Sequence, residues 1–182
     1  MVLAGFAISP EQRRTWLQQE ADGGGATYRA ECVLALDGVA RDRLSQALAE
    51  AVRRHEILRT RFERVQGLLL PVQVVEAPAA EIPLEVLTGP GDEEAVLRAA
   101  FDTLRAPSGG PALRAAWVDG PARSLLCLSL PALCADAGTL RVLAQELVAA
   151  TASVASTPDE APLQYADVAA WLNELLESAR LA

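Results

Sequence analysis

The sequence predicts a layered α/β fold, an α+β sandwich in which a mixed sheet has helices packed on it. Short apolar segments of strand length alternate along the chain with longer amphipathic segments of helix length. Of the 182 residues, 51% are hydrophobic, and the mean hydropathy is +0.18. The chain is therefore long and apolar enough to bury a core.

The first third of the chain predicts a helix, a strand and a second helix. Residues 8–20 begin with Ser9, a suitable helix cap, and Pro10 at the first helical position. Residues 27–38 end in an Asp-Gly turn, which is typical of a strand. From residue 39 to 54, apolar residues recur at helical spacing with charges on the other face. This second helix is expected to pack on the sheet.

The rest of the chain predicts further strands and helices. The helix at 92–105 has acidic residues in its first turn, as the helix dipole prefers. The expected strands are 58–65, 68–76, 82–87, 112–118 and 124–130. The remaining helices are expected at 138–153 and 163–178.

Composition excludes several kinds of site. Three separated cysteines without a C-x-x-C pair, and a single histidine, argue against a disulfide framework and a metal site. All 16 basic residues are arginine, which excludes Schiff-base and phosphate-loop lysines. A net charge of −8 argues against nucleic acid as a partner. No apolar run approaches the ~20 residues of a membrane span, and no basic secretory start is present. We therefore expect a cytoplasmic protein without a membrane partner.

Four segments of the chain form a recognisable series. They are SPEQRRTW (9–16), RRHEILRTRF (53–62), FDTLRAPSGGPALRAAWV (101–118) and PLQYADVAAW (162–171). In this order they resemble the N-terminal lobe of condensation domains of nonribosomal peptide synthetases. Each alone is weak, but together they extend over nearly the whole chain. The resemblance implies a chloramphenicol-acetyltransferase-like lobe over residues 1–182, with the second lobe of a complete domain absent. Loss of that lobe predicts an exposed apolar surface that self-associates or binds a partner.

A fifth segment bears on catalysis. The family motif HHxxxDG falls on PALCADA, so that Pro131 and Ala132 replace the histidines, Ala137 replaces the glycine, and only the aspartate is retained, as Asp136. In the family, the second histidine is thought to position or deprotonate the acceptor amine. Ala132 offers only a methyl group, and general acid–base help is typically worth ~10²- to 10⁴-fold. We therefore expect no ordinary catalytic residue in this loop.

Structural roles are expected for the remaining candidates. Asp136 can cap the following helix, and the resemblance implies an ion pair between Asp136 and Arg59. His55 closes the helix at 39–54, where the dipole favours a cation. Cys134 is an alternative nucleophile at a helix start, but a small buried residue is the favoured interpretation. Core packing is expected for the tryptophans Trp16, Trp117 and Trp171.

The resemblance leads to a main functional hypothesis and two alternatives. The leading one is a non-catalytic, condensation-like scaffold that recruits a tailoring enzyme or a carrier protein in secondary-metabolite synthesis. The first alternative is an acyl or peptidyl transferase lobe that joins carrier-bound substrates without the usual histidine. The second is an inert remnant that neither binds a partner nor catalyses a reaction. No cofactor is expected on the chain itself, apart from the phosphopantetheine of a partner carrier protein.

Overall fold

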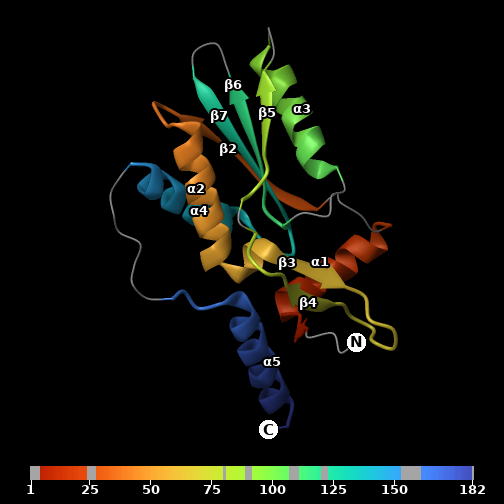
Figure 1. Ribbon diagram of the computed structural model, residues 1–182. Coiled ribbons are helices and arrows are strands. Elements are labelled where there is room, and N and C mark those ends of the chain that lie inside the picture. Colours follow the sequence, from red (N-terminus) through yellow and green to blue (C-terminus); the bar gives the residue numbers. More distant parts are fainter. Residues whose placement is uncertain are drawn as a thin grey trace.

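The computed structural model describes most of the chain, in seven stretches. They are residues 5–23, 28–79, 81–88, 92–106, 111–119, 123–152 and 161–181. A mixed four-stranded sheet with helices on both faces forms the larger part, and a smaller three-stranded sheet lies below it (Figure 1). The predicted fold class is therefore confirmed.

The larger sheet has the strand order β2-β7-β6-β5. Its strands are β2 (Arg29–Leu36), β5 (Leu84–Thr88), β6 (Arg114–Asp119) and β7 (Ser124–Pro131). The pairs β2–β7 and β7–β6 are antiparallel, whereas β5 runs parallel to β6. Strand β7 is central and buried on both faces, as its nearly unbroken apolar sequence predicts. This strand delivers the chain into the loop that carries the altered motif.

Helices cover both faces of this sheet. Helices α2 (Arg41–Arg54) and α4 (Ala137–Thr151) pack on one face, and α3 (Glu93–Arg105) packs on the other (Figure 1). The main core lies between the sheet and the α2–α4 pair and includes Trp117. A smaller apolar cluster lies under α3.

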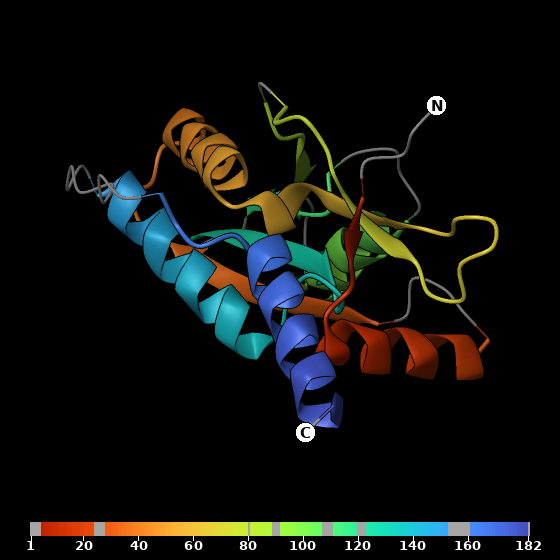
Figure 2. The same ribbon diagram turned by 90° about the horizontal axis from the view of Figure 1, so that it is seen from below.

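The smaller sheet has the order β1-β4-β3 and is antiparallel throughout. It contains β1 (Phe6–Ala7), β3 (Thr60–Glu63) and β4 (Val72–Val75), and a short 3-10 turn, η1 (Glu56–Arg59), leads into β3. Helices α1 (Pro10–Ala21) and α5 (Tyr165–Leu181) lie beside it (Figure 2). Strand β1 was not predicted, because two residues carry no readable periodicity.

The three tryptophans differ in burial, and the prediction of core packing was wrong for Trp171. Trp117 is buried, and Arg41 lies over its ring at 5.2 Å from the centroid. Trp16 is half-buried beneath Arg64 at 5.1 Å. Trp171 is 59% exposed, because only the opposite face of α5 meets the body of the molecule.

Candidate functional site

The altered motif forms a short loop between β7 and α4. The amides of Cys134 and Ala135 donate to the carbonyl of Pro131 at 2.8 and 3.2 Å, which closes a tight turn. The amide of Ala132 donates to the carbonyl of Tyr28, in the residue just before β2, at 2.8 Å. The main chain of the loop is thus held by backbone bonds that do not depend on its side chains.

A buried glutamine pair joins this loop to α1 and the smaller sheet. The side-chain nitrogen of Gln12, Nε2, donates to the carbonyl of Leu133 at 3.0 Å and to the side-chain oxygen of Gln73 at 3.1 Å. Gln73 in turn donates to the carbonyl of Ala7 at 2.9 Å. Both glutamines are almost fully buried, so each bond satisfies a group that water cannot reach. No local sequence pattern marks these two residues as partners, because they lie 61 residues apart in the chain.

Gln12 also belongs to the capping box of α1. Its backbone amide donates to Ser9 Oγ at 3.1 Å, and its side-chain oxygen accepts from the Ser9 amide at 2.9 Å. Ser9 Oγ also shares a hydrogen bond with the Tyr165 hydroxyl at 2.8 Å. The cap predicted at Ser9 is therefore present, and it links the start of α1 to the start of α5.

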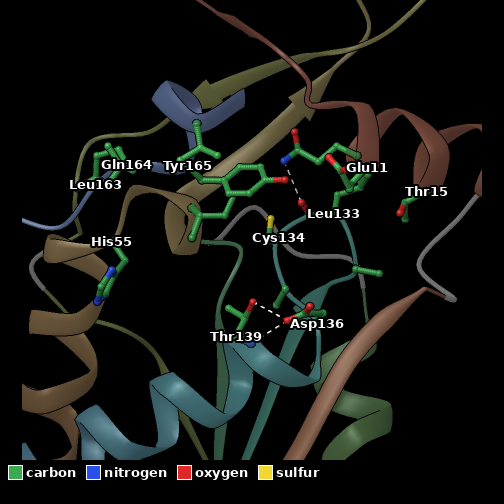
Figure 3. A pocket seen from close by; sticks show the side chains of 15 residues that line it. Glu11, Thr15, His55, Leu133, Cys134, Asp136, Thr139, Leu163, Gln164 and Tyr165 are labelled. Carbon is green, nitrogen blue, oxygen red and sulfur yellow. Dashed lines mark hydrogen bonds between the residues drawn. The ribbon is translucent and has the colours of Figure 1, made fainter. Parts of the chain in front are cut away.

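Asp136 caps α4, as the sequence predicted. Its carboxylate accepts from the amide of Thr139 at 2.7 Å and from the Thr139 hydroxyl at 2.8 Å (Figure 3). These two hydrogen bonds, the backbone one first, hold the pKa of the Asp136 carboxyl below its ordinary value because they favour the charged form. The side chain therefore has a structural explanation within its own helix.

The expected ion pair between Asp136 and Arg59 was wrong. The Arg59 guanidinium donates to the carbonyls of Val52 and Glu76 and pairs with the Glu56 carboxylate at 3.4 Å. Arg59 ends the short turn before β3, and its half-buried side chain is used to close that turn against the chain leaving β4. With the Asp136 carboxylate bonded within α4, the two residues serve separate elements.

His55 lies at the C-terminal end of α2, where the sequence placed it. Its Nε2 is 2.7 Å from a carboxylate oxygen of Glu146 on α4, so the pair ties together the two helices that cover the sheet. Next to it, the side chain of Gln164 accepts from the Glu56 amide at 3.0 Å and donates to the Arg54 carbonyl at 3.1 Å. These contacts fix the segment that leads into α5.

A cavity of about 430 Å³ adjoins the loop. In Figure 3, Tyr165 and Cys134 lie between His55 on one side and Glu11 and Thr15 on the other. The wall is a mixture of apolar and polar side chains. It consists of Glu11, Gln12, Thr15, His55, Ile57, Ala132, Leu133, Cys134, Ala135, Asp136, Thr139, Leu163, Gln164, Tyr165 and Val168.

At the position of the second motif histidine, the wall of the cavity carries a methyl group. Ala132 is part of the wall, and a methyl group has no lone pair with which to accept a proton. The single imidazole of the chain, His55, lines the same cavity but is bonded to Glu146. The cavity could hold a ligand. The carboxylates of Glu11 and Asp136 belong to its wall, but the motif position itself carries no imidazole.

Cys134 does not supply a replacement nucleophile. Burial raises the pKa of its thiol to about 12, so the reactive thiolate is scarce at neutral pH. Its sulfur lies 3.7 Å from the Thr60 carbonyl oxygen, toward the core. The interpretation as a small buried residue is confirmed.

Neither a metal site nor a membrane-spanning helix is found in the seven described stretches. They hold no group of three His, Cys, Asp or Glu side chains that could bind a metal ion. None of their helices is both long and apolar enough to cross a bilayer.

Comparison with known proteins decides the family. The family model described as "Condensation domain" matches residues 4–182. This chain belongs to the condensation-domain family. The predicted resemblance to nonribosomal peptide synthetase condensation domains is thereby confirmed.

Curated relatives of this condensation domain are much longer proteins. Chondramide synthase of Chondromyces crocatus is 37% identical over 185 residues, which cover 92% of this chain but 5% of that protein. Tyrocidine synthase 3 of Brevibacillus parabrevis is 30% identical over 177 residues, covering 95% of this chain and 3% of that protein. The chain therefore spans a small part of these relatives.

Solved condensation domains share the fold. The condensation domain of the monacolin K polyketide synthase MokA superposes with a TM-score of 0.80 at 24% identity, covering 98% of this chain and 41% of that one. The first condensation domain of the calcium-dependent antibiotic synthetase gives 0.77 at 24% identity, covering 98% and 44%. These neighbours confirm the predicted chloramphenicol-acetyltransferase-like fold. This chain covers less than half of either solved chain.

Proposed function

We propose that this chain is a non-catalytic condensation-like lobe, which serves as a scaffold for a carrier protein or a tailoring enzyme of a peptide assembly line. The observation that carries the proposal is the methyl group of Ala132 in the cavity wall, where the family places its proton-handling histidine. Around it, the main chain of the loop, the Asp136 cap and the cavity are all intact. A fold preserved around a missing catalytic group fits a binding role better than an enzymatic one.

A tailoring enzyme is one of the two partner classes. A solved neighbour is described as a complex of the X-domain and OxyB from teicoplanin biosynthesis, and it matches this chain with a TM-score of 0.73 at 24% identity. The likeness at this identity concerns the fold alone. It supports the idea that a lobe of this shape can present a surface to a second protein.

The test is a transfer assay combined with a binding assay. Donor and acceptor carrier proteins loaded with aminoacyl groups are mixed with the chain and a second condensation lobe supplied in trans, and amide product is followed by mass spectrometry. We expect the wild type to give no product above the uncatalysed rate. Binding of carrier or tailoring protein is measured on the same samples. Robust turnover by the wild type would overturn the proposal.

The alternative function is transfer by positioning alone. The cavity of about 430 Å³, whose wall includes Tyr165, favours it, because holding two reactants together can accelerate a reaction without proton transfer. The variant Ala132→His separates the two functions. Turnover by the wild type that rises further in the variant would indicate a weakened enzyme. Binding without turnover by the wild type would indicate a scaffold.

A further inference from the structure

A layer of charged side chains lies at one end of the sheet face that α3 covers. Ser129 follows Cys127 by two residues on β7, so it points to the same face as that residue, which packs under α3. The cross-strand neighbours of Ser129 are Glu31 on β2 and Arg114 on β6. Three adjacent strands thus bring polar groups together beside the end of α3.

Most groups of this layer are bonded to one another. The Ser129 hydroxyl donates to the Glu31 carboxylate at 3.0 Å. Arg105, the last residue of α3, donates to the same carboxylate through two nitrogens, at 3.0 and 2.5 Å. Arg114 donates to the carbonyl of Ala106 at 2.6 Å. The Glu31 carboxylate is therefore already shared between a hydroxyl and a guanidinium.

Arg29, at the start of β2, is the arginine of this layer that lacks an ion pair. Its Nε donates to Ser129 Oγ at 2.7 Å. Its Nη2 is buried and has no hydrogen-bond partner in the described part of the chain. Since about nine in ten buried polar groups in proteins have a partner, this nitrogen marks a place where a bonded group is missing.

The charges around Arg29 favour an anion over a water molecule as that group. Burial lowers the pKa of the Arg29 guanidinium, Glu31 raises it, and Arg114 and Arg105 lower it. The guanidinium nevertheless remains protonated, as arginine does in proteins. A water molecule could accept a hydrogen bond from Nη2 but would leave the charge uncompensated. An anion supplies both the acceptor and the opposite charge.

The layer lies at the border of the molecule. Arg29 is partly exposed, and the side chain of Arg114 is 17% exposed. Two carboxylates approach the other arginines from the surface, because Glu85 lies 4.0 Å from Arg114 and Asp102 lies 3.5 Å from Arg105. Those carboxylates partly neutralise Arg114 and Arg105, which leaves Arg29 as the guanidinium without a direct counter-ion among the described residues.

We propose that Arg29 and Arg114 form a binding site for one small oxyanion, with Arg29 making the main contact. A planar guanidinium presents parallel N–H donors that match two oxygens of a sulfate, phosphate or carboxylate group. Arg29 lies opposite Pro131 in the β2–β7 pair, and the neighbouring Tyr28 carbonyl holds the Ala132 amide. A bound anion would therefore stabilise the strand end that supports the motif loop. Neither arginine belongs to the cavity wall, so the site is independent of the proposed function.

The experiment follows the N–H signals of the arginine side chains by NMR while sodium sulfate, phosphate or acetate replaces sodium chloride at constant ionic strength. The Arg29 signal is assigned by its loss in Arg29→Met. We expect this signal to shift saturably with at least one of the three anions, whose relative affinities distinguish a tetrahedral from a planar ligand. Arg114→Met should weaken binding about tenfold, because it removes one charge-assisted contact.

Arg98→Met is the matched control. Arg98 also lies on α3 or its surroundings as a surface arginine, since its side chain is 68% exposed and pairs with Glu94 of the same helix. Its replacement should change the affinity less than twofold. In Arg29→Met, the shift of the Arg114 signal that accompanies binding in the wild type should disappear.

Three results would overturn the site. A shift of the Arg29 signal that does not saturate, and is no larger than that of Arg98, would indicate an adventitious ion only. A signal that none of the three anions moves would assign the buried nitrogen to water. Arg29→Lys keeps the charge without the planar fork and replaces Arg29→Met where circular dichroism shows that variant unfolded. Its affinity, read from the Arg114 signal, should fall severalfold, and an unchanged affinity is the third contrary result.

Discussion

At the scale of single residues, the loop after β7 contains a small side chain, Ala132, in the cavity wall and a buried thiol, Cys134. Ala132 presents a methyl group to the cavity, and Cys134, two residues later, turns its thiol toward the Thr60 carbonyl. Neither group can exchange a proton readily near neutral pH. Chemistry on this loop would therefore need a group from outside it.

The burial of Cys134 predicts slow alkylation. Its pKa of about 12 leaves a thiolate fraction of roughly 10⁻⁴ at pH 8. We expect iodoacetamide to leave Cys134 unmodified in the native chain and to modify it fully in concentrated guanidinium, as read by peptide mass spectrometry. Cys32, which is half-buried, is the internal comparison and should react earlier. Rapid native labelling of Cys134 would show that the loop opens.

The cap at Asp136 predicts a pH-dependent stability. Replacing it by alanine should lower the free energy of unfolding by about 1 kcal/mol at pH 7, the usual worth of such a cap. Because hydrogen bonds lower its folded pKa below the ordinary 3.8, the carboxylate contributes above that value and loses its contribution as pH falls through the folded pKa. Urea unfolding at pH 7 and pH 3 should show the alanine penalty shrinking in acid.

The control for this cap is Asp136→Asn. Asparagine caps helices nearly as well as aspartate, so most of the stability at pH 7 should remain while the dependence on pH flattens. A constant alanine penalty at both pH values would mean that the carboxylate charge contributes nothing.

At the scale of elements, α1 and the motif loop behave as one unit because Gln12 bonds to both. Its side chain serves the Ser9 amide, the Gln73 oxygen and the Leu133 carbonyl. The side chain is 3% exposed, so its removal leaves buried polar groups without partners. Each such group costs ~1–3 kcal/mol.

We therefore expect Gln12→Ala to lower the free energy of unfolding by about 2 kcal/mol or more. Gln18→Ala is the matched control, because Gln18 is exposed on the same helix and its side chain donates to the exposed Asp22. That control should stay within ~0.5 kcal/mol of wild type. Equal effects of the two changes, measured by chemical denaturation, would contradict the role given to the buried network.

The elements themselves were largely predictable from the sequence. Periods of two and 3.6 residues place strands and helices, and side-chain caps such as Ser9 mark where helices begin. The two-residue β1 was missed because its formation depends on pairing with β4. The partner of Arg59 was missed because it is set by the path of the chain after β4, which local pattern does not encode.

At the scale of the whole molecule, α5 leaves an apolar face uncovered. Its described contacts are made mainly with β1, α1 and η1, and its outer half extends from the body (Figure 2). The exposed large apolar side chains on and just before this helix are Leu163, Trp171, Leu175 and Leu176. This helix therefore exposes apolar side chains. That they belong to the surface left by an absent second lobe stays a prediction.

We expect the purified chain to self-associate through this face. The double variant Trp171→Glu/Leu175→Glu should shift the sedimentation profile toward monomer, because it places charges on the apolar surface. Leu69→Glu is the control, since Leu69 is 90% exposed in the turn between β3 and β4 and lies outside this helix. A monomeric wild type, or dissociation by the control alone, would exclude α5 as the contact.

The hydrogen bond from the Ala132 backbone amide to the Tyr28 carbonyl has a practical consequence for spectroscopy. Because the main chain there is anchored independently of the side chain, a nitrile-bearing or fluorinated residue placed at this point would keep a defined orientation. Its vibrational frequency or chemical shift would report the hydration of the adjoining cavity and whether a bound ligand displaces that water. A probe at position 132 would thereby report on the interior of the cavity.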